Sequence, residues 1–195
     1  MISEPIILSF DTSAAYCAAA LLCGDEILQS QVLEMGRGQA EALMPMLEDL
    51  LKQQNLAWTD LSAIGVGTGP GNFTGIRISV SAARGLALAL NVPAIGVSTF
   101  EATGFGLEGT VVTAVPAPRD QIYISDPTRG PNPILTSAPY ATDLPIKTAL
   151  PAAQLVENIA HVAKTRLQFP LQRPAPLYIR AADAAPPRDA PPKIL

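Results

Sequence analysis

The sequence predicts an α/β fold in which helices flank a mixed β-sheet, followed by a shorter second region. Short apolar runs alternate with longer stretches of helical periodicity through residues 1–115. Of the 14 glycines, 13 precede residue 116, whereas 15 of the 19 prolines follow residue 115. Net charge changes sign at the same place: 4 Lys/Arg against 11 Asp/Glu give −7 before it, and 9 against 6 give +3 after it. Two unlike lobes are therefore expected.

The first part of the chain is predicted to form an antiparallel meander followed by a helix. Residues 6–10 are a short apolar run typical of a buried strand, and residues 16–22 and 27–33 predict two more strands joined by a turn. Leucines at helical spacing predict a helix over residues 39–53. Pro45 lies within that helix and is expected to kink it.

Parallel crossovers are predicted next, because strands and helices then alternate. The expected elements are a strand at 64–67, a helix at 74–90 and a strand at 94–97. Ser98 and Glu101 form a capping box that begins a further helix. A meander continued by crossover helices gives a mixed sheet covered by helices.

The second region is predicted to begin with strands at 111–115 and 122–125. Pro151 then precedes an amphipathic helix whose apolar residues are Leu155, Ile159, Val162, Ala163 and Leu167. The predicted organisation is a first lobe (1–103), a reduced second lobe (104–180) and a Pro/Ala-rich tail (181–195).

Composition excludes several classes of protein. No apolar run approaches the ~20 residues of a bilayer span, and the first residues lack an export signal. Cys17 and Cys23 lie in one predicted strand, where their Cα atoms would be ~20 Å apart, beyond the reach of a disulfide. Two free thiols fit a reducing compartment, so a cytoplasmic location is expected. An acidic chain without a Lys/Arg cluster is a poor nucleic-acid binder on its own.

A glycine-rich loop, Gly65-Val-Gly-Thr-Gly-Pro-Gly-Asn-Phe-Thr-Gly-Ile-Arg77, is the most informative motif. It directly precedes a helix, where free amides and the helix dipole favour an anion. However, it contains neither a Walker A motif nor G-x-G-x-x-G. The alternative is that the glycines allow the loop and helix to pack closely against a neighbouring segment. The sequence leaves both interpretations open.

The helix at 74–90 is apolar nearly all round, since Arg77 and Arg84 are its only charged residues. One interpretation is a central core helix. The other is that its outer face, together with the 39–53 helix, forms an apolar protein–protein interface. Gly75, Ala82 and Ala89 would let another helix approach closely.

These features resemble the TsaB family, the dimerisation subunit of the bacterial tRNA threonylcarbamoyladenosine synthase. The resemblance rests on Ile-Leu-Ser-Phe-Asp11-Thr-Ser, Leu-Met-Pro45-Met, Gly-Pro70-Gly-Asn-Phe-Thr-Gly-Ile-Arg77 and Pro93-Ala-Ile-Gly-Val-Ser-Thr, and weakly on Pro176-Leu-Tyr-Ile-Arg180. It implies an actin/Hsp70-like fold of two ribonuclease-H-like lobes, the second one shortened here. It also implies a partner interface made by Met44, Leu47, Leu51, Gly71, Phe73, Ile76, Val80, Ala83 and Ala87.

The resemblance also implies a pseudoenzyme without catalytic, cofactor-binding or metal-binding residues. The family's catalytic relative, TsaD, carries two metal-binding histidines where this chain has Thr99 and Thr103, and a hydroxyl is a weak ligand by comparison. The single histidine, His161, is expected to have a packing role. Pro116 and Pro118 remove amide donors from the hairpin expected to hold phosphate.

Asp11 allows two interpretations. It resembles the aspartate of the superfamily's first phosphate loop, which holds a hydrated metal. It could equally be a turn residue that accepts hydrogen bonds from backbone amides.

The function implied is that of a subunit that dimerises with a TsaD-type catalytic protein, recruits a TsaE-type ATPase and contacts tRNA through the complex. The complex uses ATP, this chain binds no cofactor by itself, and the isolated chain is expected to homodimerise. The alternatives are a self-sufficient nucleotide-dependent transferase, kinase or metallopeptidase of the same superfamily, and a nucleotide-sensing regulator.

Overall fold

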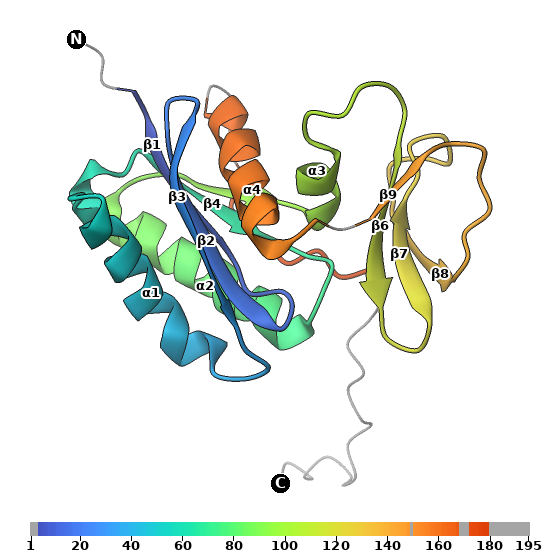
Figure 1. The fold of residues 1–195 in the computed structure, drawn as a ribbon, viewed down its shortest axis with the longest axis horizontal. Coiled ribbons are helices and arrows are strands. Elements are labelled where there is room, and N and C mark those ends of the chain that lie inside the picture. Colours follow the sequence, from blue (N-terminus) through green and yellow to red (C-terminus); the bar gives the residue numbers. More distant parts are fainter. Residues whose placement is uncertain (1–3, 149, 168–171, 180–195) are drawn as a thin grey trace, which may run out of the picture.

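The computed structural model describes residues 4–148, 150–167 and 172–179 and contains two lobes side by side (Figure 1). The elements of the first lobe up to its third helix are β1 (Ile6–Asp11), β2 (Tyr16–Cys23), β3 (Glu26–Glu34), α1 (Gln39–Gln53), the 3₁₀ turn η1 (Trp58–Asp60), β4 (Ala63–Gly67), α2 (Phe73–Leu90), β5 (Ala94–Val97) and α3 (Thr99–Gly104). The remaining elements are β6 (Val112–Ala117), β7 (Gln121–Ser125), β8 (Ile134–Ser137), β9 (Ile146–Thr148) and α4 (Ala152–Arg166).

The first sheet is mixed, as predicted. Its five strands follow the order β3-β2-β1-β4-β5. The β1–β2 and β2–β3 pairs are antiparallel, whereas β1–β4 and β4–β5 are parallel. The predicted strands and helices of this lobe are all present, and the Ser98–Glu101 capping box opens α3. Local periodicity was therefore sufficient to place these elements.

Both faces of the first sheet are covered by helices (Figure 1). Successive strand residues point to opposite faces, so Leu8 and Phe10 join the core under α1 and α2 while Ile7 joins the core under α4. Burial on both faces explains why β1 and β2 are almost continuously apolar. Cys17 and Cys23 are free, and burial raises the pKa of the Cys17 thiol to about 11.

Helix α4 corrects the predicted division of the chain. The sequence analysis assigned it to the second lobe, but Leu155, Val156 and Ile159 pack against the first sheet. The Ser9 hydroxyl, in the middle of β1, donates a 2.7 Å hydrogen bond to the Val156 carbonyl. Without α4 one face of the five-stranded sheet would be exposed. The long apolar face of this helix therefore packs on that sheet and not on the small second sheet.

The second sheet has four strands in the order β8-β7-β6-β9. Its buried apolar core consists of Val112, Ala114 and Ile124. The strands β6 and β7 match the predicted strands, whereas β8 and β9 were not predicted. Both are short and lie beside prolines, which weaken a strand pattern in the sequence. The predicted tail, 181–195, lies outside the described residues.

The glycine-rich loop packs against the turn between β1 and β2. A Cβ added at Gly75 would lie 1.9 Å from the Thr12 carbonyl oxygen, and one at Gly71 would lie 2.4 Å from that of Ser13. The Thr12 hydroxyl donates a 2.7 Å hydrogen bond to the Gly75 carbonyl. These glycines therefore serve close packing, the second of the two interpretations left open by the sequence.

Gly75→Ala is expected to destabilise the fold by about 3 kcal/mol or more, because the new methyl group meets a backbone oxygen that can move only with the whole turn. Gly85→Ala is the matched control in the same helix. Nothing lies within 4 Å of its added Cβ, so we expect stabilisation by about 0.5–1 kcal/mol from the better helix propensity of Ala. Urea unfolding at concentrations where the chain is monomeric measures both. Similar effects of the two substitutions would contradict the close-approach argument.

Candidate functional site

Five of the nine residues predicted at a partner interface lie in the chain's own core. Side chains at most 3% exposed, between the helices and the sheet, are those of Leu47, Leu51, Ile76, Val80 and Ala83. A buried side chain cannot contact a partner, so the prediction is wrong for these residues. In a helix that is apolar all round, periodicity alone does not tell which face the sheet covers.

The other four predicted residues are partly exposed but have different surroundings. Met44 and Ala87 are half-buried at the edges of the helical layer. Phe73 stacks on Tyr178 with ring centroids 4.7 Å apart and belongs to the cleft between the lobes. Gly71 packs on the β1–β2 turn, as described above. The nine residues therefore do not form one continuous surface.

The side of α2 that faces away from the sheet is mostly apolar and partly exposed, with the exposed side chains of Arg77 and Arg84 beside it. We call it the outer α2 surface; it consists of Ile78, Ser81, Ala82, Gly85, Leu88 and Ala89. Leu88 is 85% exposed, and it also lines a groove of about 530 Å³ beside Val92 and Pro93. Of the small residues expected there, Ala82 and Ala89 belong to this surface, whereas Gly75 does not. Such a face is suited to close contact with another helix.

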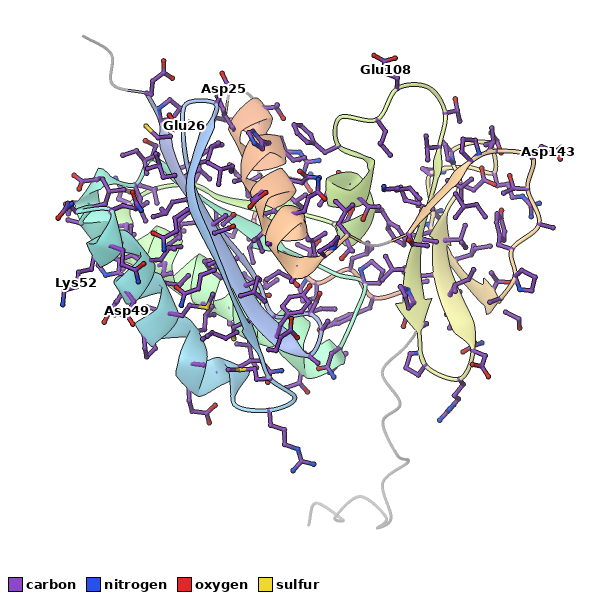
Figure 2. All side chains as sticks on the ribbon, in the orientation of Figure 1. Asp25, Glu26, Asp49, Lys52, Glu108 and Asp143 are labelled. Carbon is purple, nitrogen blue, oxygen red and sulfur yellow. The ribbon has the colours of Figure 1, made fainter. Side chains whose placement is uncertain are left out.

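Two comparisons show that this surface is unusual. The neighbouring α1 exposes charged side chains, including Asp49 and Lys52, which point away from the sheet (Figure 2). The sequence analysis found no apolar run of the length of a bilayer span, whereas α2 is long and apolar enough to cross a membrane by length and composition alone, with 28% of its residues buried in the chain. Its inner face packs on the sheet, and Asn72 caps its start by accepting a 2.9 Å hydrogen bond from the Gly75 amide. The apolar excess therefore lies on the exposed side of a helix packed into an α/β lobe.

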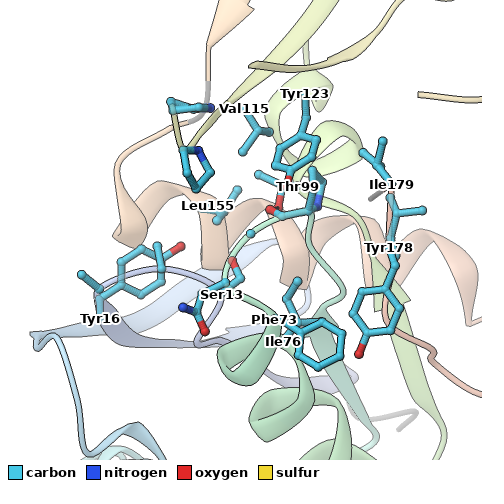
Figure 3. A pocket seen from close by; sticks show the side chains of 18 of the residues that line it. Ser13, Tyr16, Phe73, Ile76, Thr99, Val115, Tyr123, Leu155, Tyr178 and Ile179 are labelled. Atoms are coloured by element: carbon cyan, nitrogen blue, oxygen red, sulfur yellow. Dashed lines mark hydrogen bonds between the residues drawn. The ribbon is translucent and has the colours of Figure 1, made fainter. Parts of the chain in front are cut away.

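A cleft of about 1110 Å³ lies between the two lobes (Figure 3). The first lobe contributes the β1–β2 turn, the glycine-rich loop and the start of α2. The second lobe contributes the β6–β7 hairpin, including Pro116, Pro118 and Tyr123. Residues 177–179 form a further wall. Among the described residues that line the cleft, Arg77 carries the one charged group; its guanidinium lies 4.0 Å from the Phe73 ring centroid and donates a 2.9 Å hydrogen bond to the Tyr178 hydroxyl.

Asp11 is the last residue of β1 and lies directly before the β1–β2 turn. Its Oδ2 accepts hydrogen bonds from the Ser13 amide (3.0 Å), the Ser13 hydroxyl (2.7 Å) and the Tyr16 hydroxyl (2.8 Å). Its Oδ1 has no hydrogen-bond partner among the described residues and lies where a side chain at position 67 would begin, since a Cβ added at Gly67 would be 2.0 Å from it. Burial raises the pKa of Asp11, and the hydrogen bonds from Ser13 and Tyr16 oppose this rise. Asp11 is completely buried, and the hydrogen bond that it accepts from the Ser13 amide is the backbone contact expected in the second interpretation.

The positions compared with the metal-binding histidines lie on α3. Thr99 is buried and donates a 3.4 Å hydrogen bond to the Pro70 carbonyl, and Thr103 is buried beside it along the helix. His161, on α4, stacks on Phe105 with ring centroids 5.4 Å apart, which is a packing role. Within the described ranges no group of three His, Cys, Asp or Glu residues could hold a metal.

Comparison with known protein families identifies relatives of the chain. The family model of tRNA N6-adenosine threonylcarbamoyltransferase, TsaD, matches residues 33–178. The tRNA threonylcarbamoyladenosine biosynthesis protein TsaB of Escherichia coli is 33% identical over 133 residues, which cover 66% of this chain and 57% of that protein. TsaB of Bacillus subtilis is 35% identical over 120 residues, covering 60% of this chain and 52% of that protein. The match thus spans about half the length of these curated relatives.

Two solved structures from Pseudomonas aeruginosa share the fold. YeaZ is 25% identical with a TM-score of 0.68, covering 89% of this chain and 99% of that chain. An uncharacterized protein with similarity to peptidase YeaZ is 27% identical with a TM-score of 0.70, covering 90% and 100%. Together with the two mixed sheets and their flanking helices, this likeness confirms the predicted actin/Hsp70-like fold class.

Asp11→Asn is expected to change how stability depends on pH. The raised pKa means that the folded chain binds this proton more tightly than the unfolded chain, whose aspartate titrates near 3.9. That stabilisation is complete below about pH 3.9 and is lost as the pH rises through the folded-state pKa. The free energy of unfolding of Asp11→Asn, measured relative to wild type in urea between pH 4 and 8, should therefore rise with pH, by at most ~1.4 kcal/mol per pH unit.

The control for this prediction is Asp143→Asn, which removes an exposed carboxylate from the second lobe. This variant measures the effect of losing one exposed negative charge, without the loss of a buried, hydrogen-bonded carboxylate. A constant difference between wild type and Asp11→Asn over the whole pH range would contradict the prediction.

Proposed function

Because the chain belongs to the TsaB family, we propose that it is a non-catalytic subunit that pairs with a TsaD-type catalytic protein in threonylcarbamoyladenosine synthesis on tRNA. The complex would modify the adenosine beside the anticodon of ANN-reading tRNAs in the cytoplasm. A TsaE-type ATPase would join the pair and use ATP. The catalytic residues would belong to the TsaD-type subunit.

The observation that carries this proposal is the outer α2 surface. Ile78 and Ala82 are only half-buried, Leu88 is 85% exposed, and Gly85 and Ala89 leave room for a close helix contact. Covering such a face with the apolar face of another helix removes it from water, which is the main favourable term in protein association. The buried residues Ile76, Val80 and Ala83 support the interface indirectly by holding α2 on the sheet.

The surroundings of the cleft support a non-catalytic role. Asp11 is completely buried behind Ser13 and Tyr16, whose hydroxyls donate to its carboxylate, and it does not line the cleft. Pro116 and Pro118 lack the amide protons that phosphate would need on the facing hairpin. The Thr99 hydroxyl already donates a hydrogen bond to the Pro70 carbonyl. The chain is therefore proposed to bind no cofactor by itself.

Contact with tRNA is proposed to be indirect. The first part of the chain carries 4 Lys/Arg against 11 Asp/Glu, and a net negative charge opposes binding to the phosphate backbone. In the absence of its partner, the chain is proposed to homodimerise through the outer α2 surface, because the same apolar face would otherwise remain in water.

Leu88→Lys is expected to weaken binding to the cognate TsaD-type subunit by about tenfold or more, because a charge would be placed in an apolar interface. Lys is a good helix former and is compatible with the helix C-terminus, so the fold should be retained. Leu107→Lys is the matched control: Leu107 is also exposed, at 40%, but lies between α3 and β6. Calorimetric titration should give a wild-type Kd for the control. Equal Kd values for both variants would contradict the proposed surface.

The isolated chain is expected to produce no threonylcarbamoyladenosine from threonylcarbamoyl-AMP and tRNA, because the described part of the chain offers no cluster of metal ligands or free general base in the cleft. Adding the TsaD-type subunit should restore product formation, and the Leu88→Lys variant should lower it in proportion to lost binding. Nucleoside analysis of the tRNA measures this. Turnover by the isolated chain would overturn the proposed pseudoenzyme role.

A further inference from the structure

A groove lies along the C-terminal half of α2, beside the outer α2 surface. It has a volume of about 530 Å³ and is bounded by the helix, by the segment that leads from α2 into β5, and by residues 172–174. Leu88 forms part of its wall and is 85% exposed, and a Cβ added at Gly85 would meet no atom within 4 Å. Gly85 and Leu88 also belong to the outer α2 surface, so the groove and that surface are continuous.

The wall of the groove is mostly apolar but carries two positive charges. Its apolar lining consists of Ala87, Leu88, Val92, Pro93, Ala94 and Pro174. The charged residues are Arg84 and Arg173, which are both exposed and form no ion pair with a residue in the described part of the chain. No Asp or Glu is found among the described residues that line the groove. The groove thus combines an apolar wall with two cations and no anion.

This combination fits an apolar side chain that is flanked by a carboxylate. An apolar side chain in the groove would remove Leu88 and its apolar neighbours from water, which favours association. The planar guanidinium of an arginine donates two parallel hydrogen bonds to a carboxylate, and arginine is among the residues enriched in protein–protein interfaces. A segment in which Leu, Ile, Met or Phe lies next to Asp or Glu therefore matches both features of the groove.

A second copy of this chain does not match the groove. A symmetric contact between two copies places the same patch of each against the other. If such a contact were centred on this groove, Arg84 and Arg173 of the two copies would approach one another, and like charges repel. The groove therefore favours a different protein over a second copy, a distinction that the apolar residues of the outer α2 surface do not make.

An RNA backbone also matches the groove less well than a protein segment. Two arginines can bind phosphate, but most of the lining is apolar. The neighbouring α1 exposes Glu41, Glu48 and Asp49, whose charges oppose the approach of a nucleic acid. A protein segment is therefore the occupant that the groove favours.

We propose that this groove is the charged part of the interface with the TsaD-type subunit, and that it binds a segment of that subunit in which an apolar side chain lies next to an acidic one. The apolar side chain packs against Leu88 and Val92, and the carboxylate binds Arg84 or Arg173. This inference rests on the proposed function and adds specificity to it, because the groove selects an acidic partner over a second copy of the chain.

The double substitution Arg84→Gln and Arg173→Gln tests the proposal, because it removes both charges and places a good helix former in α2. Calorimetric titration at low salt should give a Kd for the TsaD-type subunit about tenfold higher than that of the wild type. The difference should shrink to about threefold in roughly 0.5 M NaCl, because salt screens the charges. Arg119→Gln, which removes an exposed arginine from the β6–β7 hairpin, is the matched control and should keep the wild-type Kd at both salt concentrations.

A second measurement identifies the group that the arginines contact. In an Arg84→Lys variant, a carbodiimide joins the introduced amine to a carboxylate that touches it. Mass spectrometry of the treated complex should then find position 84 linked to an Asp or Glu of the TsaD-type subunit. The matched variant Arg119→Lys should give no such linked peptide.

The outcomes separate this inference from the proposed function. Binding by the wild type that the double substitution leaves unchanged would overturn the inference alone, whereas an absence of binding by the wild type would overturn both. Crosslinks from position 84 only to a second copy of the chain would also overturn the inference. So would weaker binding of tRNA by the complex of the double variant without any change in the Kd for the subunit, since the arginines would then serve RNA.

Discussion

The close approach of the glycine-rich loop to the β1–β2 turn is the constraint on which the rest of the structure depends. Gly67, Gly71 and Gly75 each face that turn at a distance that leaves no room for a side chain. The contact is made by backbone groups, because the Asn72 amide donates a 2.6 Å hydrogen bond to the Ser13 carbonyl. The start of α2 is thereby held at the end of the central strand β1. The position of this first turn fixes the rotation of α2 about its own axis. It therefore determines which face of the helix meets the sheet and which face remains exposed.

The same contact explains the state of Asp11. Gly67 brings the β4 backbone against one carboxylate oxygen, while Ser13 and Tyr16 occupy the other. Burial disfavours the charged forms of both acids, so the pKa of Asp11 and that of Tyr16 are raised above their ordinary values. A carboxylate closed off in this way supports the turn. The tight packing that orders the helix thus also separates this aspartate from the cleft.

The two lobes are joined by chain segments that return to the first sheet. After the second sheet, α4 covers the open face of the first, and its Lys164 forms a 2.7 Å ion pair with Asp25 at the β2–β3 turn. Residues 172–179 then pass the glycine-rich loop on their way to the cleft. The small core of the second sheet is therefore attached to a much larger one, and the cleft forms at their boundary. On the first lobe, the outer α2 surface stays exposed in the chain by itself.

The sequence by itself determined the elements of the first lobe, the mixed order of its sheet and the existence of an apolar helical layer, because the period of apolar residues is a local property of each segment. The sequence also identified the glycine-rich loop and Asp11 as features of interest, but it allowed two interpretations of each. Only the tertiary structure decided which residues of α2 are buried, that Leu47 and Val80 belong to the core and Leu88 to the surface, and that α4 packs on the first sheet. These outcomes depend on how segments distant in the sequence fit together, and a residue's pattern within its own helix carries no information about which neighbour will cover it.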